Sequence, residues 1–251
     1  MRFDEGDAHL FGISKFLDKR KLVRALEDYP VYSPPSRGAK KFNAPQEQAN
    51  FAYFMEHKDR RLAALTAFMA KFSIELGMSP SGVSEVGAWL YRFGAYIVSR
   101  NPKVLQAIYT YEPSWTGEFL PLNIMKDVSI YAGEYIIYKT GNAKWVIGKA
   151  ERGFWIQQPR LHVPDQKFDK YPSISGEVLD CCTSSRARLT TGSNSPMDQW
   201  ADAAEFGRRI AFFADKNPPL KYRSKTFPPS FHEILDGMHP DAADEYERNR
   251  K

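Results

Sequence analysis

Cysteine is scarce in this chain of 251 residues, which has only Cys181 and Cys182, next to each other. Adjacent thiols exclude a disulfide framework, because a bridge between neighbours requires a strained ring. Long apolar runs are also missing: the most apolar window, 83–98, is interrupted by Glu85 and Arg92 and is too short to cross a bilayer. The N-terminal stretch is acidic where a secretory signal needs basic residues. We therefore expect a cytoplasmic protein that does not span a membrane.

Motifs that hold metals, nucleotides or cofactors are absent from the sequence. His232 and Glu233 begin like the helix of a zinc protease, but Asp236 stands where the second histidine is needed. There is no glycine-rich phosphate loop, no dinucleotide fingerprint and no nucleophile elbow. We expect neither a metal nor a cofactor. The histidines, which lack ligand spacing, are His9, His57, His162, His232 and His239.

Charge of one sign is not in large excess, since 35 basic residues face 30 acidic ones and the net charge is +5. Such a balance is typical of an ordinary solvated surface. Residues 9–29 have helical periodicity, with basic side chains on the expected outer face. A nucleic-acid-binding module that uses this helix and residues 216–225 is an alternative function. The apolar side chains expected to face inward are Leu10, Ile13, Phe16, Leu17, Val23 and Leu26.

Two long helices are predicted in the first half of the chain. Asn43 caps the first, which has Pro45 in its first turn and extends to Gly77. The second lies within residues 79–102, a segment that starts with the Ser-Pro signal of Ser79, and we expect the two to pack as an antiparallel pair. The inner face predicted for the second helix consists of Val83, Val86, Leu90, Phe93 and Ile97.

Residues 127–147 are the stretch around which we expect the chain to be organised. An amphipathic helix with an apolar face that includes Tyr138 is followed by a Gly-Asn turn and a short strand opened by Trp145. Residues 153–159 are predicted to pair with this strand as a hairpin. Trp145, Gly133 and Trp89 are the predicted structural residues. The fold class is α+β, with long helices packed on a small antiparallel sheet.

Three segments are predicted along the chain. Residues 1–42 comprise an N-terminal helix and a proline-rich linker, and residues 43–214 form the α+β core domain. Residues 215–251 form a helical C-terminal extension.

One spacing is compatible with catalysis. Five residues separate Cys182 from Arg188, as in cysteine phosphatases, where a loop of backbone amides and the arginine hold a phosphate beside the thiolate. Here the intervening segment has no glycine to help its amides turn inward. The run 174–182 before it is compatible with either strand or helix. We expect structural thiols and no catalytic residue, with a phosphate-binding enzyme as the alternative and Cys182 and Arg188 as its candidates.

Glu134 is the carboxylate of most interest, and Tyr131 and Tyr135 beside it complete the predicted binding residues. A carboxylate on this apolar helix is expected to be partly buried and to need an arginine or a backbone amide as partner. Catalysis would require a second acid or base at a defined distance, which the sequence does not offer. We therefore predict that Glu134 forms a structural ion pair.

Several of these segments carry a resemblance to a group of known proteins. The matching features are residues 76–83 (LGMSPSGV), Trp89-Leu90, residues 131–137 (YAGEYII) and Trp145. Over roughly residues 60–160 the chain resembles uncharacterised bacterial α+β proteins of the toxin-immunity type. The resemblance implies a cytoplasmic bacterial binding protein, not an enzyme, whose partner is a cognate toxin that it occludes.

Overall fold

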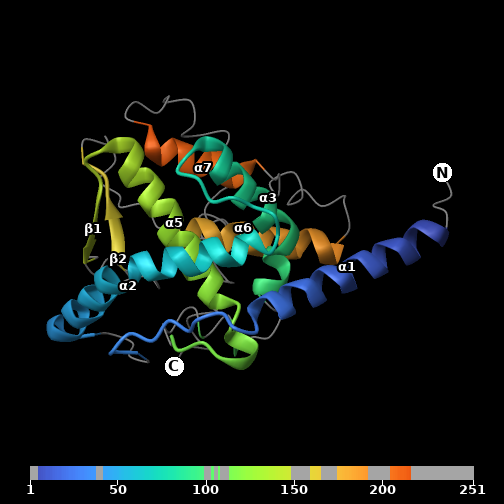
Figure 1. Cartoon of the computed structure of the whole chain (residues 1–251), viewed down its shortest axis with the longest axis horizontal. Coiled ribbons are helices and arrows are strands. Elements are labelled where there is room, and N and C mark those ends of the chain that lie inside the picture. The colour runs from blue at the N-terminus through green and yellow to red at the C-terminus, as the bar shows by residue number, and fades with distance from the viewer. Residues whose placement is uncertain are drawn as a thin grey trace, which may run out of the picture. The chain divides into compact units, whose positions relative to one another are not determined.

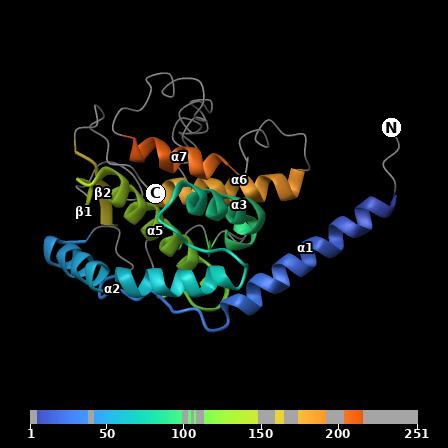
Figure 2. The same cartoon turned by 45° about the horizontal axis from the view of Figure 1, so that its top comes forward.

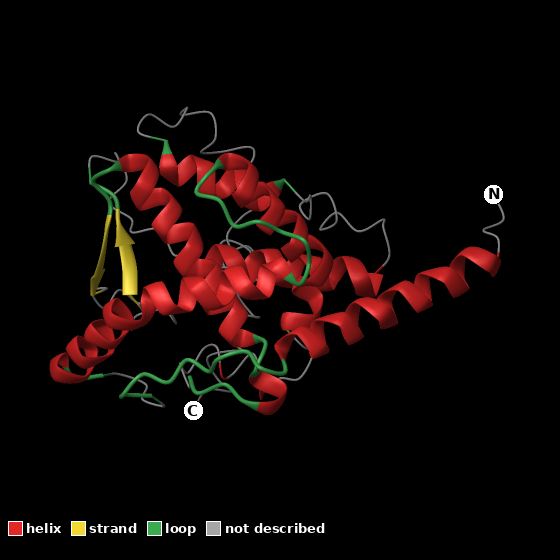
Figure 3. Cartoon of the chain, viewed as in Figure 1, coloured by secondary structure: helices red, strands yellow, loops and turns green. Residues whose placement is uncertain are grey.

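The computed structural model describes residues 5–37, 42–98, 103, 104, 107, 113–147, 159–164, 174–191 and 204–215. In chain order the elements are α1 (Glu5–Leu26), α2 (Ala44–Ala70), α3 (Pro80–Ile97), η1 (Gly117–Phe119), α5 (Leu122–Thr140), β1 (Lys144–Ile147), β2 (Pro159–His162), α6 (Ile174–Thr191) and α7 (Glu205–Ala214) (Figure 1). The described residues are mostly helical and include a two-stranded antiparallel sheet (Figure 3). The α+β prediction is confirmed at this level. Apart from Asp215, the predicted C-terminal extension lies outside the described residues.

The chain divides at residue 216, and all the described residues belong to the first unit, residues 1–216. The end of α1 contributes to the core of the first unit, because Leu22, Leu26 and Tyr29 belong to the same buried cluster as residues of α3 and α5. The N-terminal helix and the core helices thus share one hydrophobic cluster. In the part of the chain that the structure describes, no helix combines the length and apolar content needed to cross a membrane.

Helix α5 is the central helix of the described core. It contacts α2, α3, α6 and α7 (Figure 2), and every residue from Leu122 to Gly133 is buried. The sequence predicted an amphipathic helix, but neighbours on several sides bury α5 almost all round for three turns. Tyr138, expected to face inward, is 66% exposed near its end. Gly141 then ends the helix with a left-handed φ of 72°, as predicted for the Gly-Asn turn.

Side-chain caps begin α2 and α3. The Asn43 side chain accepts a hydrogen bond from the Gln46 amide, and the Gln46 side chain accepts one from the Asn43 amide, both at 3.0 Å. This reciprocal pair is a capping box, so the predicted start of α2 is confirmed. Ser79 caps α3 in a similar way. The predicted end of α2 at Gly77 is wrong, since the helix stops at Ala70.

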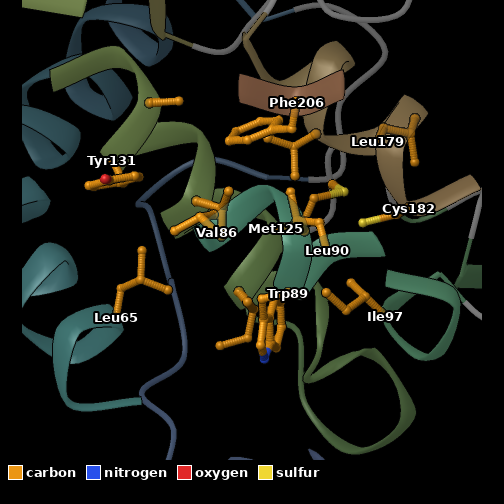
Figure 4. Packing of buried hydrophobic residues seen from close by; sticks show 14 of the residues in the cluster. Leu65, Val86, Trp89, Leu90, Ile97, Met125, Tyr131, Leu179, Cys182 and Phe206 are labelled. Atoms are coloured by element: carbon orange, nitrogen blue, oxygen red, sulfur yellow. The ribbon is translucent and has the colours of Figure 1, made fainter. Parts of the chain in front are cut away.

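Helix α3 packs mainly against α6 and α7, and not along α2 as the sequence suggested. Near the end of α2, Phe68 and the following Phe72 contact the ring of Trp89 in α3. Gly94 allows α6 to come close instead, because a Cβ there would lie 2.9 Å from the Cα of Cys182. The face of α3 was predicted correctly (Figure 4), with Val83, Val86, Leu90, Phe93 and Ile97 all buried.

The small sheet has a different partner strand from the one expected. Lys144 pairs with His162 and Ile147 with Pro159, so β2 begins where the predicted strand 153–159 ends. Trp145 lies opposite Leu161, which is fully buried. Strand register follows the side chains that the fold can bury, and Leu161 is such a residue. Residues 148–158 lie outside the described part of the chain.

Candidate functional site

Glu134 lies in a partly buried contact between α5, β1 and α2. Its Oε1 accepts a hydrogen bond from the Trp145 indole nitrogen at 2.7 Å and lies 3.3 Å from Nζ of Lys58. Gly133 makes room for this tryptophan, because a Cβ at Gly133 would lie 2.1 Å from the Trp145 ring. Phe54 packs edge-on against the same ring at 5.0 Å. The carboxylate thus joins three elements, with a lysine and an indole in place of the expected arginine or backbone amide.

The other predicted binding residues are in the core. Tyr131 is buried (Figure 4), and its hydroxyl donates a hydrogen bond of 2.7 Å to the Gly77 carbonyl. Tyr135 is buried as well, and burial raises the pKa of both hydroxyls. Neither tyrosine offers a surface to a partner, so Tyr131, Glu134 and Tyr135 do not form one binding surface. Trp89, predicted to be structural, is buried against the Phe93 ring.

The sequence analysis missed a buried cluster of charged groups. Its carboxylate, Asp127, lies on α5 about two helix turns before Glu134. Arg61 of α2 donates two hydrogen bonds to the Asp127 carboxylate, from Nε at 2.8 Å and from NH2 at 2.5 Å. The Tyr29 hydroxyl donates a third at 2.5 Å. A bidentate arginine-carboxylate pair is among the strongest polar contacts in proteins. Lys126, next to Asp127, is buried too and lies over the rings of Tyr32 and Phe54.

Burial acts on the charges of this cluster in opposite directions. It raises the pKa of the Asp127 carboxyl to about 6, while Arg61, Tyr29 and Lys126 lower it, so Asp127 is ionised at neutral pH. Burial lowers the pKa of Lys126 to about 8, and the Asp127 charge opposes that change. Two cations and one anion therefore lie in the core.

The charged cluster holds the segment that follows α1. Arg61 donates a hydrogen bond to the Pro30 carbonyl at 2.6 Å, and the Tyr32 amide donates one to the Asn123 side chain at 2.8 Å. The two acceptors provide hydrogen-bond partners for the Arg61 guanidinium and the Tyr32 amide, which would destabilise the fold if they were buried without partners. The cluster is thus a structural connection between this segment, α2 and α5. Its signal in the sequence is the charged pair Lys126-Asp127 inside an otherwise apolar helical stretch.

Lys126 gives the protein a defined pH dependence. Its pKa is about 8 in the folded chain against 10.5 in an unfolded one, so between these values the unfolded chain binds more protons. Stability from this group therefore rises as pH increases from about 8 to 10. The variant Lys126→Met should lack that rise. The thiols of Cys181 and Cys182, whose pKa values burial raises, act in the opposite direction but cancel when the two proteins are compared.

Urea denaturation of both proteins at pH 8, 9 and 10 measures this effect. We expect the free energy of unfolding of the natural chain to increase relative to that of Lys126→Met at each step. Parallel profiles would show that Lys126 does not change its protonation in this range.

The segment from Cys182 to Arg188 is part of helix α6 and not a loop. Its backbone amides lie in a helix, so they do not encircle a phosphate. Cys182 is buried against Gly94 of α3, and burial raises the pKa of its thiol to about 12. The arginine whose charge acts on Cys181 is Arg209 of α7, which Glu177 holds at 2.7 Å. These features argue against the alternative of a phosphate-binding loop from Cys182 to Arg188.

Cys182 is therefore expected to be unreactive in the folded protein. The thiolate is the nucleophilic form, and a thiol with a raised pKa and no exposure supplies very little of it. Iodoacetamide at pH 8, followed by mass spectrometry, should label this residue at least about a hundredfold more slowly in the native protein than in urea. Rapid labelling of the native chain at neutral pH would restore the enzyme hypothesis.

Metal ligands do not gather in the described part of the chain. No group of three or more histidine, cysteine, aspartate or glutamate residues there is placed to hold an ion. Of the histidines, His57 stacks on Tyr53 at 4.0 Å, and His162 ends β2. His9 belongs to helix α1, and His232 and His239 lie outside the described residues.

Helix α1 carries an exposed surface that the sequence analysis assigned to the core. Phe16, Leu17 and Val23 are 63%, 55% and 54% exposed, so these three predictions of burial are wrong. Leu22 and Leu26 bury the opposite side of the helix instead. The apolar side chains lie among exposed basic ones, namely Lys19, Arg20, Lys21 and Arg24. We call the exposed side chains of residues 16–24 the α1 surface.

Comparison of the chain with protein-family models, with curated protein sequences and with solved structures finds no match.

Proposed function

We propose that this chain is a binding protein without an enzymatic role, and more specifically a cytoplasmic bacterial immunity protein that occludes a cognate toxin. The α1 surface carries the proposal. Phe16, Leu17 and Val23 expose most or about half of their area on one helix, and grouped apolar side chains with a polar rim mark interaction sites. The resemblance of residues 60–160 to immunity proteins supports the same function.

The alternatives have weaker support. The enzyme hypothesis depended on a loop from Cys182 to Arg188, and that segment is helical with a buried thiol. A nucleic-acid-binding module would use the basic side chains of α1 and the exposed ring of Phe16, but one ring is a small platform for stacked bases, and exposed leucine and valine add little to binding of a phosphate backbone. The other segment of that hypothesis, 216–225, lies outside the described residues.

The test is co-purification of the full chain with the product of an adjacent toxin gene, together with rescue of growth on co-expression. Apolar anchors should let the complex survive moderate salt, whereas a phosphate-backbone contact loses affinity steeply. The double variant Phe16→Ser/Leu17→Ser should weaken the complex at least about tenfold. Met55→Ser, which alters an exposed apolar residue of α2, is the matched control. Absence of binding and rescue, with steeply salt-dependent binding of RNA or DNA, would contradict the proposal.

A further inference from the structure

An open groove of about 800 Å³ includes part of the α1 surface. Its lining is basic and apolar and consists of Leu17, Arg20, Lys21, Arg24, Ala25 and Lys71. Its volume is in the range of about 300–1,000 Å³ that is usual for ligand sites. The helical repeat explains the gathering of cations, because residues 17, 20, 21 and 24 share one side of α1. Lys71, just past the end of α2, brings a fourth cation from a second element.

Two cations of the groove, Lys71 and Lys21, are held by contacts that leave their charge uncompensated. Lys71 donates a hydrogen bond to the Ala25 carbonyl at 2.9 Å, and Nζ of Lys21 lies 4.8 Å from the centroid of the Phe72 ring. Among the described residues, neither Arg20 nor Arg24 forms an ion pair, in contrast to Arg92, which pairs with Asp18. No carboxylate lines the groove. The groove is thus complementary to an anionic ligand.

The lining also indicates the class of anion. Leu17 and Ala25 are aliphatic, and no aromatic side chain lines the groove as a platform for stacked bases. A protein segment with carboxylates beside apolar side chains satisfies both parts of the lining, and an amphipathic helix presents them at the spacing of residues 17, 20 and 24.

We propose that this groove binds an acidic amphipathic helix of a protein partner. Carboxylates of that helix pair with Arg20, Arg24 and Lys71, and its apolar side chains contact Leu17. The inference rests on the proposed function as a binding protein and adds the chemistry of the partner segment.

A labelled synthetic helix with leucines at helical spacing flanked by glutamates serves as the probe, and fluorescence anisotropy with the full chain measures its Kd. Arg20→Glu/Arg24→Glu should raise the Kd at least about tenfold, because like charges then face each other. Arg60→Glu/Lys144→Glu makes the same change in net charge at exposed positions outside the groove and outside the α1 surface, and it should raise the Kd less than about threefold. Unchanged circular dichroism spectra show that both variants fold.

Three further ligands distinguish the alternatives: polyglutamate, a single-stranded RNA of 20 nucleotides, and vesicles that contain phosphatidylserine. The proposal requires tighter binding of the amphipathic helix than of any of these. Equal loss of binding in the two double variants, or tighter binding of polyglutamate, RNA or vesicles, would overturn it. A toxin that binds the natural chain and Arg20→Glu/Arg24→Glu equally well would also overturn the groove assignment, yet leave the proposed function intact. If the synthetic helix binds as expected but no toxin binds, the groove assignment stands and the proposed immunity function fails.

Discussion

Asp127→Ala is expected to lower the free energy of unfolding by about 3–5 kcal/mol, one of the two largest effects of any substitution considered for this chain. The carboxylate is fully buried and accepts two hydrogen bonds from Arg61 and one from Tyr29. Its removal leaves the buried Arg61 guanidinium without a compensating charge and Lys126 without a neighbouring anion. The loss is therefore larger than that of an exposed ion pair, for which about 0–1 kcal/mol is usual.

Three other variants separate charge from packing at this position. Asp127→Asn keeps the volume but not the charge, so it should show most of the decrease in the free energy of unfolding that is expected for Asp127→Ala. Tyr29→Phe removes one hydrogen bond and should cost only about 1–2 kcal/mol. Arg61→Met/Asp127→Leu removes both charges and should cost less than Asp127→Ala alone. Urea denaturation at pH 7 measures all four, and a loss below about 1 kcal/mol for Asp127→Ala would contradict a structural role for the pair.

Trp145→Ala is the second substitution with a large expected effect, again on the order of 3–5 kcal/mol. The variant loses the edge contact with Phe54 and the hydrogen bond to Glu134, and it leaves a space beside Gly133. It also detaches β1 from α2 and α5, which the indole connects. An unchanged melting temperature would show that the strand is not attached through this side chain.

A double-mutant cycle with Gly133→Ala tests the same contact more sharply. In the natural chain the added methyl group would lie 2.1 Å from the indole of Trp145, so this change alone should cost about 1–3 kcal/mol. In the Trp145→Ala background the methyl group has room, and alanine has the higher helix propensity. In that background Gly133→Ala should therefore leave the free energy of unfolding unchanged or raise it. Additive costs would mean that Gly133 is required for another reason.

Local signals in the sequence predicted the starts of α2 and α3 and the buried face of α3. Asn43 and Ser79 cap α2 and α3 through atoms within three residues, and the buried face of α3 follows from spacing alone. Such features depend on a few neighbouring residues, which is why they can be inferred without the fold.

Contacts between distant segments were missed for a physical reason. Arg61 and Asp127 are 66 residues apart, and Tyr29 is 98 residues before Asp127, so no periodicity connects them. The apolar residues of α1 were assigned inward because periodicity identifies a face but not the presence of a neighbour to cover it. Leu161 likewise became the partner of Trp145 through burial that only the complete fold defines.

The attachment of residues 29–32 to the charged cluster determines where the chain can be shortened. A truncated protein that begins at residue 43 would lose the Tyr29 hydroxyl, the Pro30 carbonyl and the Tyr32 amide together. Arg61, Asn123 and Asp127 would each lose one hydrogen-bond partner in the protein interior. Leu22 and Leu26 would also leave the core. The N-terminal helix is thus not a removable appendage. Tags and fusions belong before it, and deletions that reach Tyr29 should yield a chain that does not fold stably.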